Sequence, residues 1–268
     1  HFINTFLPKI GINTIGFRPE LSENEIETLL ASTGKADKLA LIFIETPANP
    51  TNAIIDIEMC VRIAQKYSNP DQKVLTAVDN TYMGPLWQHP LRHGADLVMY
   101  SATKYIGGHS DVIAGAVLGN RDLMKRVKTL RTFLGNMASP NTGWLLMRSL
   151  ETLKVRMEQQ AKNAEVIAQY LTKHPKVEKV YYLGLIHENS VNYHTYKRQY
   201  LSPGAMLSFD IKGGEKEAFA FLNNLKLIQL AVSLGSTESL AEHPASMTHA
   251  GIEEAHKIEM GITDKLIR

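Results

Sequence analysis

Lys104 is the residue of this sequence with the clearest potential for chemistry. It lies in the segment DLVMYSATKYIGGHSD, where an apolar run ends in a small polar cluster and two glycines follow the lysine. A lysine at the end of a buried strand can form an imine with an aldehyde, because burial lowers the pKa of the amine and supplies its neutral, nucleophilic form. A lysine at a strand end can equally be a solvated charge, so its neighbours decide between the two interpretations.

Asp79 ends a second apolar stretch, VLTAVD, and complements the lysine. Its carboxylate could keep a pyridine nitrogen protonated. A lysine and an aspartate in these roles are the minimal equipment for pyridoxal phosphate, whose ring must stay protonated to act as an electron sink. Ser101 and Thr103, just before Lys104, would offer hydroxyls to the phosphate of that cofactor. Asp79 could also simply cap a turn, so the pattern alone leaves both roles open.

Short apolar segments in the first half of the chain would position these residues. We predict strands at 40–45, 74–80, 96–101 and 113–119, buried on both faces because they are almost continuously apolar. Between the first two, Asp56 would cap a helix that carries an apolar stripe. Strands separated by helices favour an α/β fold with a mainly parallel sheet and helices on both faces, and ligands bind such a sheet at its carboxyl edge.

The second half of the chain has a different pattern. One long helical pattern from Thr142 to about His174 is followed by a strand at 206–211 and then by a further helix. We therefore predict a large cofactor-binding domain at 1–154 and a smaller α+β domain at 155–268. The chain begins with His1 and stops at Arg268, so we expect both domains to lack terminal parts.

Composition favours a cytoplasmic protein that acts on small molecules. The 268 residues are 44% hydrophobic and carry 29 basic and 27 acidic side chains, which are interspersed and give a net charge of +2. No patch of one sign indicates binding to nucleic acid or to an anionic membrane. Cys60 is the only cysteine, which excludes an internal disulfide and fits a reducing compartment. The sequence contains no apolar run long enough to span a bilayer.

Several motifs together resemble one family. The segment DLVMYSATKYIGGHS resembles the signature of the pyridoxal phosphate enzymes of cysteine and methionine metabolism, which include cystathionine γ-synthase, cystathionine lyases and methionine γ-lyase. The segments ETPANPTN, AVDNTYMGPLWQHPLRHGADLV, AVSLGSTESLAEHPASMTH and GITDKLIR look like further blocks of this family in the same order. The resemblance runs from end to end. It implies the fold of type I pyridoxal phosphate transferases and a homotetramer built from pairs of active dimers.

The resemblance implies roles for the residues of the cofactor site. Lys104 would hold the cofactor as an imine and later shuttle protons between substrate carbons. Asp79 would pair with the pyridine nitrogen, and Asn49 would hydrogen-bond the phenolic oxygen. Ser101 and Thr103 would bind the phosphate. A tyrosine that stacks on the ring in the family, and further phosphate-binding residues, would precede the point where this chain begins.

Three more residues would face the substrate. By the same resemblance, Ser233 would orient the lysine or the substrate carboxylate, and Arg268 would bind that carboxylate with its two-donor fork. Val232 stands where relatives that handle cystathionine usually carry glutamate. A valine leaves the distal ammonium of cystathionine unpaired, a penalty of about 1–3 kcal/mol.

Val232 therefore favours the γ-elimination of L-methionine to methanethiol, ammonia and 2-oxobutanoate. The side chain of methionine carries no charge that needs a partner. Two alternatives remain open. One is γ-replacement, as in cystathionine γ-synthase or O-acyl-homoserine sulfhydrylase, and the other is cystathionine γ-lyase activity.

Three other classes of protein, namely serine acyl-enzymes, metalloproteins and binding modules without a cofactor, fit the sequence less well. SATK also matches the S-x-x-K motif of serine acyl-enzymes, but that serine opens a helix, whereas this one ends a strand and is soon followed by glycines. His89 and His93 are spaced like metal ligands, and His243 and His249 lie close together in the sequence. Pro90 interrupts the first pair and no carboxylate is spaced as a third ligand, so we expect no metal site. A binding module without cofactor remains a third possibility for the chain by itself.

Overall fold

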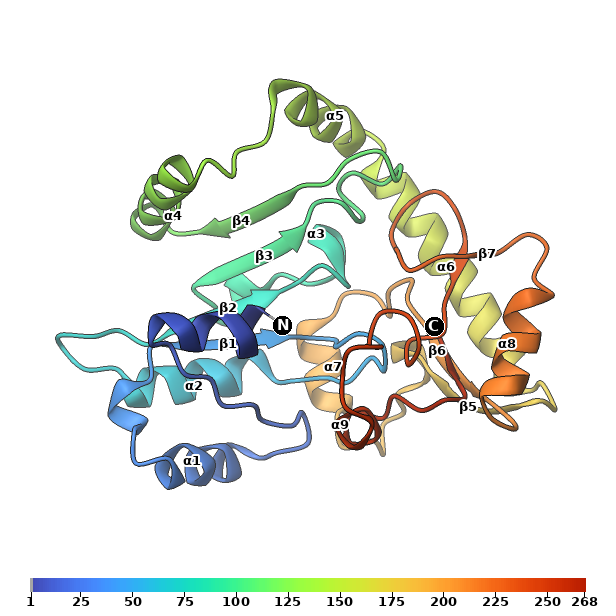
Figure 1. Cartoon of the computed structure of the whole chain (residues 1–268), viewed down its shortest axis with the longest axis horizontal. Coiled ribbons are helices and arrows are strands. Elements are labelled where there is room, and N and C mark those ends of the chain that lie inside the picture. Colours follow the sequence, from blue (N-terminus) through green and yellow to red (C-terminus); the bar gives the residue numbers. More distant parts are fainter. Residues whose placement is uncertain (1) are drawn as a thin grey trace.

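A four-stranded sheet lies in the first half of the chain (Figure 1). The computed structural model describes residues 2–268. The strands, in spatial order, are β1 (Leu41–Glu45), β2 (Leu75–Asp79), β3 (Leu97–Ser101) and β4 (Gly115–Gly119). The first three are parallel and β4 is antiparallel to β3. The four predicted strands and the mainly parallel sheet are thus confirmed, with one antiparallel edge strand that needs no helical crossover.

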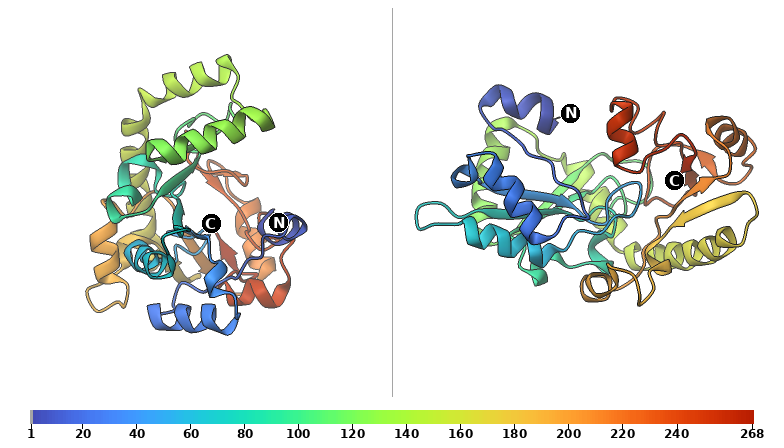
Figure 2. Two further views of the ribbon diagram at one scale, coloured as in Figure 1. Left: turned by 90° about the vertical axis from the view of Figure 1, so that its left-hand side faces the viewer. Right: turned by 90° about the horizontal axis from the view of Figure 1, so that it is seen from below.

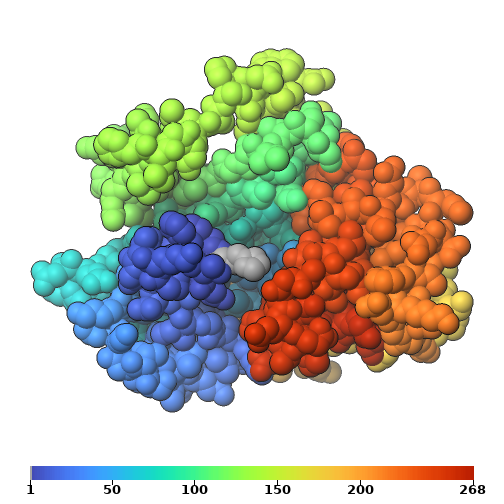
Figure 3. Space-filling model, in the orientation of Figure 1, coloured from blue at the N-terminus to red at the C-terminus, as the bar shows by residue number. Residues whose placement is uncertain are grey.

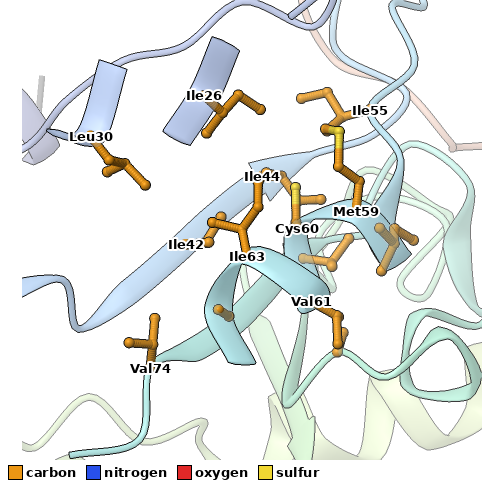
Figure 4. Close-up of a cluster of buried hydrophobic side chains, with 14 residues drawn as sticks. Ile26, Leu30, Ile42, Ile44, Ile55, Met59, Cys60, Val61, Ile63 and Val74 are labelled. Carbon is orange, nitrogen blue, oxygen red and sulfur yellow. The ribbon is translucent and has the colours of Figure 1, made fainter. Parts of the chain in front are cut away.

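Two helices cover one face of this sheet. They are α1 (Glu23–Ser32) and α2 (Ile57–Tyr67). Ile26 and Leu30 of α1 and the apolar stripe of α2 pack against Ile42 and Ile44 of β1 (Figure 4). Asp56 caps α2 as predicted, because its carboxylate accepts hydrogen bonds from two backbone N–H groups of the first turn. This layer fixes β1 and β2, and therefore the edge at which both strands end.

The expectation that all four strands are buried on both faces was wrong for β1 and β4 within residues 2–268. Leu41 and Phe43 of β1 are 46% and 38% exposed, and Leu118 of β4 is 45% exposed. Only one face of β1 packs against α1 and α2, and β4 is an edge strand of this sheet.

Three helices connect the two halves of the chain. They follow the short helix α3 (Gly84–Trp87) and are α4 (Arg121–Leu134), α5 (Pro140–Leu150) and α6 (Leu153–Thr172). The prediction of one long helix from Thr142 to about His174 was wrong, because α5 ends before α6 begins. At the break, the N–H groups of Glu151 and Thr152 donate to carbonyls three residues earlier, which tightens the chain into a turn.

A second, antiparallel sheet lies in the second half of the chain. Its strands are β5 (Val177–Tyr181), β6 (Ser208–Ile211) and β9 (Leu266–Ile267). The other regular elements here are α7 (Tyr193–Gln199), α8 (Glu215–Asn223), β7 (Gln229–Leu230), β8 (Leu240–Ala241) and α9 (Glu254–Glu259). Short helices of other types span Phe2–Phe6, Leu7–Ile10, Ala36–Lys38, Pro90–His93 and Leu183–Leu185. The predicted boundary between domains at 154 and 155 stays a prediction, and it falls within α6.

The two sheets lie side by side, and the loops of the second half pack against the carboxyl edge of the first sheet (Figure 2). In the space-filling view the orange and red C-terminal segments meet the first half of the chain (Figure 3). A shared core crosses this contact, with Tyr82, Trp87 and Tyr105 from the first half and Tyr200 and Leu234 from the second. Among residues 2–268, no helix is both long and apolar enough to cross a membrane.

Candidate active site

The carboxyl edge of the first sheet gathers the polar residues that end its strands. Glu45 and Asp79 are register partners at the ends of β1 and β2. One carboxylate oxygen of Asp79 accepts a hydrogen bond from the N–H of Thr81 at 2.9 Å, and the hydroxyl of Thr81 accepts one from the N–H of Ser101 at 2.7 Å. Thr81 therefore ties the end of β2 to the end of β3, and it brings Asp79 and Ser101 to one place.

Lys104 lies in a tight turn that begins where β3 ends. Its N–H donates to Ser101 O at 3.0 Å, and its carbonyl accepts from the N–H of Gly108 at 2.7 Å. The Nζ atom donates to Ser233 Oγ at 3.0 Å, so the predicted pair of Lys104 and Ser233 is in direct contact. Burial lowers the pKa of Lys104, and the positive charge of Arg268 lowers it further, whereas Glu242 opposes this shift. The site therefore increases the fraction of the neutral amine that imine formation requires.

Two glycines explain how the turn around Lys104 is packed. Gly108 has a φ of +69°, and a Cβ there would lie 2.0 Å from Arg156 Nη1, which donates to Tyr105 O at 3.0 Å. Gly235 has a φ of +78°, and a Cβ there would lie 2.7 Å from Tyr105 N. A side chain at Gly108 would displace the end of Arg156, whereas at Gly235 it would collide with backbone, so Gly235 requires a residue without a side chain. The loop that carries Ser233 can therefore approach the backbone next to Lys104.

Arg268 contacts three other predicted site residues. Its side chain is only 3% exposed. Nη1 donates to Asn49 Oδ1 at 3.0 Å, and Nη2 donates to the carbonyls of Val232 and Ser233 at 2.9 and 3.1 Å. Because Ser233 also accepts from Lys104, the amine and the guanidinium meet at the same short segment. Val232 itself is 49% exposed.

The two residues predicted to bind a phosphate differ in their surroundings. Thr103 Oγ1 donates to Ala114 O at 3.2 Å and accepts from Ala114 N at 3.0 Å, so its hydroxyl joins the Lys104 turn to the segment before β4. To donate to a phosphate, Thr103 would have to exchange its bond to the carbonyl. Ser101 lies at the end of β3, three residues before Lys104. Their role in phosphate binding stays a prediction.

Sequence reasoning missed two glutamates at the site, Glu242, which is buried, and Glu45, which is partly buried. Glu45 is the last residue of a predicted strand, so the rule that identified Asp79 could have identified it as well. Glu242 forms an ion pair with Arg268 at 2.8 Å, and its side chain is 0% exposed. Burial raises the pKa of Glu242, although Arg268 opposes the shift. The segment AEHP gave no signal of spacing that would have connected this glutamate with Arg268.

The histidines that were considered as metal ligands have other partners. His93 Nδ1 lies 2.9 Å from Glu58 Oε1, and His89 Nε2 lies 3.2 Å from Pro85 O. His243 lies between Ser246 Oγ and Asp264 O, each at 2.7 Å. These contacts stabilise loops and helix ends.

The surroundings of Glu45 predict how the stability of the folded protein depends on pH. Burial raises the pKa of Glu45 to about 7 from its ordinary 4.5, and the charge of Asp79 adds to the shift. The folded protein then binds a proton that the unfolded chain has already lost, so stability falls as the pH rises through this window. Glu45→Gln removes this loss. The free energy of unfolding of the wild type should fall between about pH 5 and about pH 8. The fall in Glu45→Gln should be smaller, and the two falls should differ by up to ~3 kcal/mol.

Urea unfolding of the complete protein at both pH values measures this difference. Glu259→Gln, which alters an exposed glutamate that pairs with Arg18, is the control and should follow the wild type. Parallel stability curves for wild type and Glu45→Gln would contradict the raised pKa.

Comparison with known proteins identifies the family. The family described as Cys/Met metabolism PLP-dependent enzyme matches residues 1–268. The chain belongs to this family. The predicted family and the predicted fold class are therefore confirmed, and the cofactor of the family is pyridoxal phosphate.

The relatives of this chain are named for different reactions. An L-methionine γ-lyase from Fusobacterium nucleatum subsp. nucleatum is 46% identical over 230 residues, which are 85% of this chain and 57% of that protein. A cystathionine γ-lyase from Bacillus subtilis is 43% identical over 263 residues, 98% of this chain and 66% of that protein. The chain thus spans little more than half the length of the F. nucleatum enzyme.

Solved structures agree with the fold. A cystathionine γ-synthase from Xanthomonas oryzae pv. oryzae, crystallised in complex with cystathionine, superposes with a TM-score of 0.86 at 38% identity. The match covers 97% of this chain and 65% of that one. A cystathionine γ-lyase from Lactobacillus plantarum, complexed with L-serine, gives a TM-score of 0.87 at 34% identity.

Proposed function

We propose that the protein containing this chain binds pyridoxal phosphate through Lys104 and acts on a sulfur amino acid. The observation that carries this proposal is the contact of Lys104 Nζ with Ser233 Oγ, next to a guanidinium bound to the same segment. A reactive amine with a lowered pKa and a buried arginine are the two groups that an amino acid substrate needs. The family supplies the cofactor assignment.

The residues at the carboxyl edge fit this cofactor. Lys104 would hold its aldehyde carbon, Asp79 would hold the proton on its ring nitrogen, and Asn49 would donate to its phenolic oxygen. Ser101 and Thr103 would donate to its phosphate. When bound, the cofactor supplies an electron sink for the negative charge that develops on the carbon next to the substrate nitrogen.

The residues of the chain would perform the remaining steps. Arg268 would bind the substrate carboxylate and fix the α-carbon near Lys104. The freed Lys104 amine would take the α-proton, and proton loss from the β-carbon would then allow the γ-sulfur group to leave. Ser233 would hold the amine in position between these transfers. The lowered pKa of Lys104 keeps part of the amine neutral, as a general base requires.

We propose L-methionine as the substrate, converted with water to methanethiol, ammonia and 2-oxobutanoate. Val232 supports this choice, since its apolar side chain gives no partner to the distal ammonium of cystathionine. Cystathionine γ-lyase and γ-replacement activities are the second candidates, because relatives with those names are similar to this chain to a comparable degree. Assays of 2-oxobutanoate and thiol from L-methionine and from L-cystathionine, and of thioether from an O-acyl-homoserine with a thiol, separate the three.

Val232→Glu should shift the preference toward cystathionine. A carboxylate at this half-exposed position can pair with the distal ammonium, so kcat/KM for cystathionine relative to methionine should rise about threefold to fivefold. Val232→Gln, with the same shape but no charge, is the matched control and should change the ratio much less. Equal ratios for the two variants would contradict the proposed role of Val232.

We also propose, on the resemblance to the family, that the complete protein is a homotetramer of active dimers located in the cytoplasm. Analytical ultracentrifugation of the complete protein tests the assembly.

A further inference from the structure

Glu242 and Arg268 are held together by their backbones as well as by their side chains. Glu242 N donates to Arg268 O at 2.9 Å, and Arg268 N donates to Glu242 O at 3.1 Å. This reciprocal pairing sets the two side chains next to each other. Glu242 Oε1 lies 2.8 Å from Arg268 Nη1 and accepts a further hydrogen bond from Thr248 Oγ1 at 3.1 Å. The carboxylate is thus oriented from two sides.

The two terminal nitrogens of Arg268 have different kinds of partner. Nη1 contacts the Glu242 carboxylate and the Asn49 side chain, whereas Nη2 contacts only the backbone carbonyls of Val232 and Ser233. The contact with Glu242 is an ion pair at 2.8 Å and the other three are hydrogen bonds, so both terminal nitrogens already have partners. An incoming carboxylate must therefore replace some of them. The neutral carbonyls are weaker partners than a carboxylate, so they are the ones that it can replace at least cost.

Among the described residues, Glu242 supplies the only anionic partner of the guanidinium at hydrogen-bond distance. An arginine that is 3% exposed would be a buried, uncompensated cation without it. It would also lose the charged one of the two partners of Nη1, which leaves Asn49 alone to orient this side of the fork. The oxygen Oε2 of Glu242 is buried and has no hydrogen-bond partner among residues 2–268. The carboxylate therefore makes its contacts with Arg268 and Thr248 through Oε1.

We propose that Glu242 is a positioning residue for the substrate carboxylate. It anchors Nη1 of Arg268 so that Nη2 exchanges its backbone carbonyls for the carboxylate of the amino acid. Glu242 itself does not touch the substrate. This inference rests on the proposed role of Arg268, and it adds that the selectivity for a carboxylate depends on a residue outside the predicted site.

The test compares two ligands that differ only in the carboxylate. L-Methionine and 3-(methylthio)propylamine are titrated into the complete protein loaded with pyridoxal phosphate, and the change in the visible band gives a dissociation constant for each. The wild type should bind the amino acid more tightly than the amine. Glu242→Gln should weaken binding of the amino acid about tenfold and leave binding of the amine unchanged. Glu178→Gln, which alters an exposed glutamate paired with Lys265 in the same half of the chain, is the control and should match the wild type.

The inference is supported if Glu242→Gln loses the preference for the ligand with a carboxylate while the wild type and Glu178→Gln keep it. An unchanged preference, or equal weakening of both ligands, would overturn it, since a general structural defect affects both. If Glu242→Gln does not fold, Thr248→Val decides, because it removes only the bond that orients Oε1 and should give a smaller loss in the same direction. A wild type that binds no cofactor would overturn the proposed function and not merely this extension.

Discussion

Lys104→Ala is expected to lower the formation of 2-oxobutanoate from L-methionine by at least about 10³-fold. The variant loses both the covalent link to the cofactor and the base that moves protons between the substrate carbons. Borohydride should no longer fix the cofactor to the protein. The fold should survive, because the amine makes a single hydrogen bond, to Ser233, at the edge of a partly buried turn. Activity, borohydride fixation and thermal unfolding are measured on the same preparation.

Lys154→Ala is the matched control for this experiment. Lys154 is exposed on α6, where it forms a weak ion pair with Glu158. Its replacement should leave activity and cofactor linkage intact. Covalent cofactor that persists in Lys104→Ala would remove the basis for the proposed site.

Asp79→Ala should lower kcat by about 10²–10³-fold, in the range observed when a group that stabilises developing charge is removed. Without the carboxylate, the ring nitrogen loses the partner that keeps it protonated, and the ring then accepts negative charge poorly. Asp79→Asn keeps an acceptor for the N–H of Thr81 but carries no charge, so it should be almost as impaired. Steady-state kinetics and the visible spectrum of the loaded protein report this loss.

Asp96→Asn separates this effect from general damage to the sheet. Asp96 lies just before β3, at the opposite edge, where it accepts from Thr76 N at 3.0 Å and pairs with Lys73. The variant should lose some stability and retain its turnover per folded molecule. Full activity of Asp79→Ala would show that another group protonates the ring, with Glu45 the nearest candidate.

The sequence predicted those site residues that follow apolar strands. Asp79 ends such a strand and Lys104 lies three residues beyond another, and a mainly parallel sheet brings strand ends together, so elementary rules were sufficient to propose both. Asn49, Ser233 and Arg268 required the resemblance to a family. They lie on loops and at a chain end that meet only because β6 pairs with β9 and the two halves pack together. Glu242 could not be predicted, because its importance depends on its pairing with Arg268.

Local structure was harder to predict where contacts with other parts of the chain determine it. The helical pattern continues through Leu150 to Leu153 without a proline or glycine, yet the chain turns between α5 and α6. Arg156, in α6, donates to Ser149 O at the end of α5 at 3.0 Å and stabilises the turn between the two helices. The exposed face of β1 is a similar case, since an apolar strand does not specify which of its faces the rest of the chain covers.

The most direct test is to identify the residue that carries the cofactor. The complete protein is loaded with pyridoxal phosphate, reduced with borohydride and digested, and the labelled peptide is sequenced by mass spectrometry. The cofactor mass should lie on Lys104, within the segment SATKYIGG. Label on a different lysine, or protein without label, would contradict the central claim that Lys104 is the reactive amine of this site.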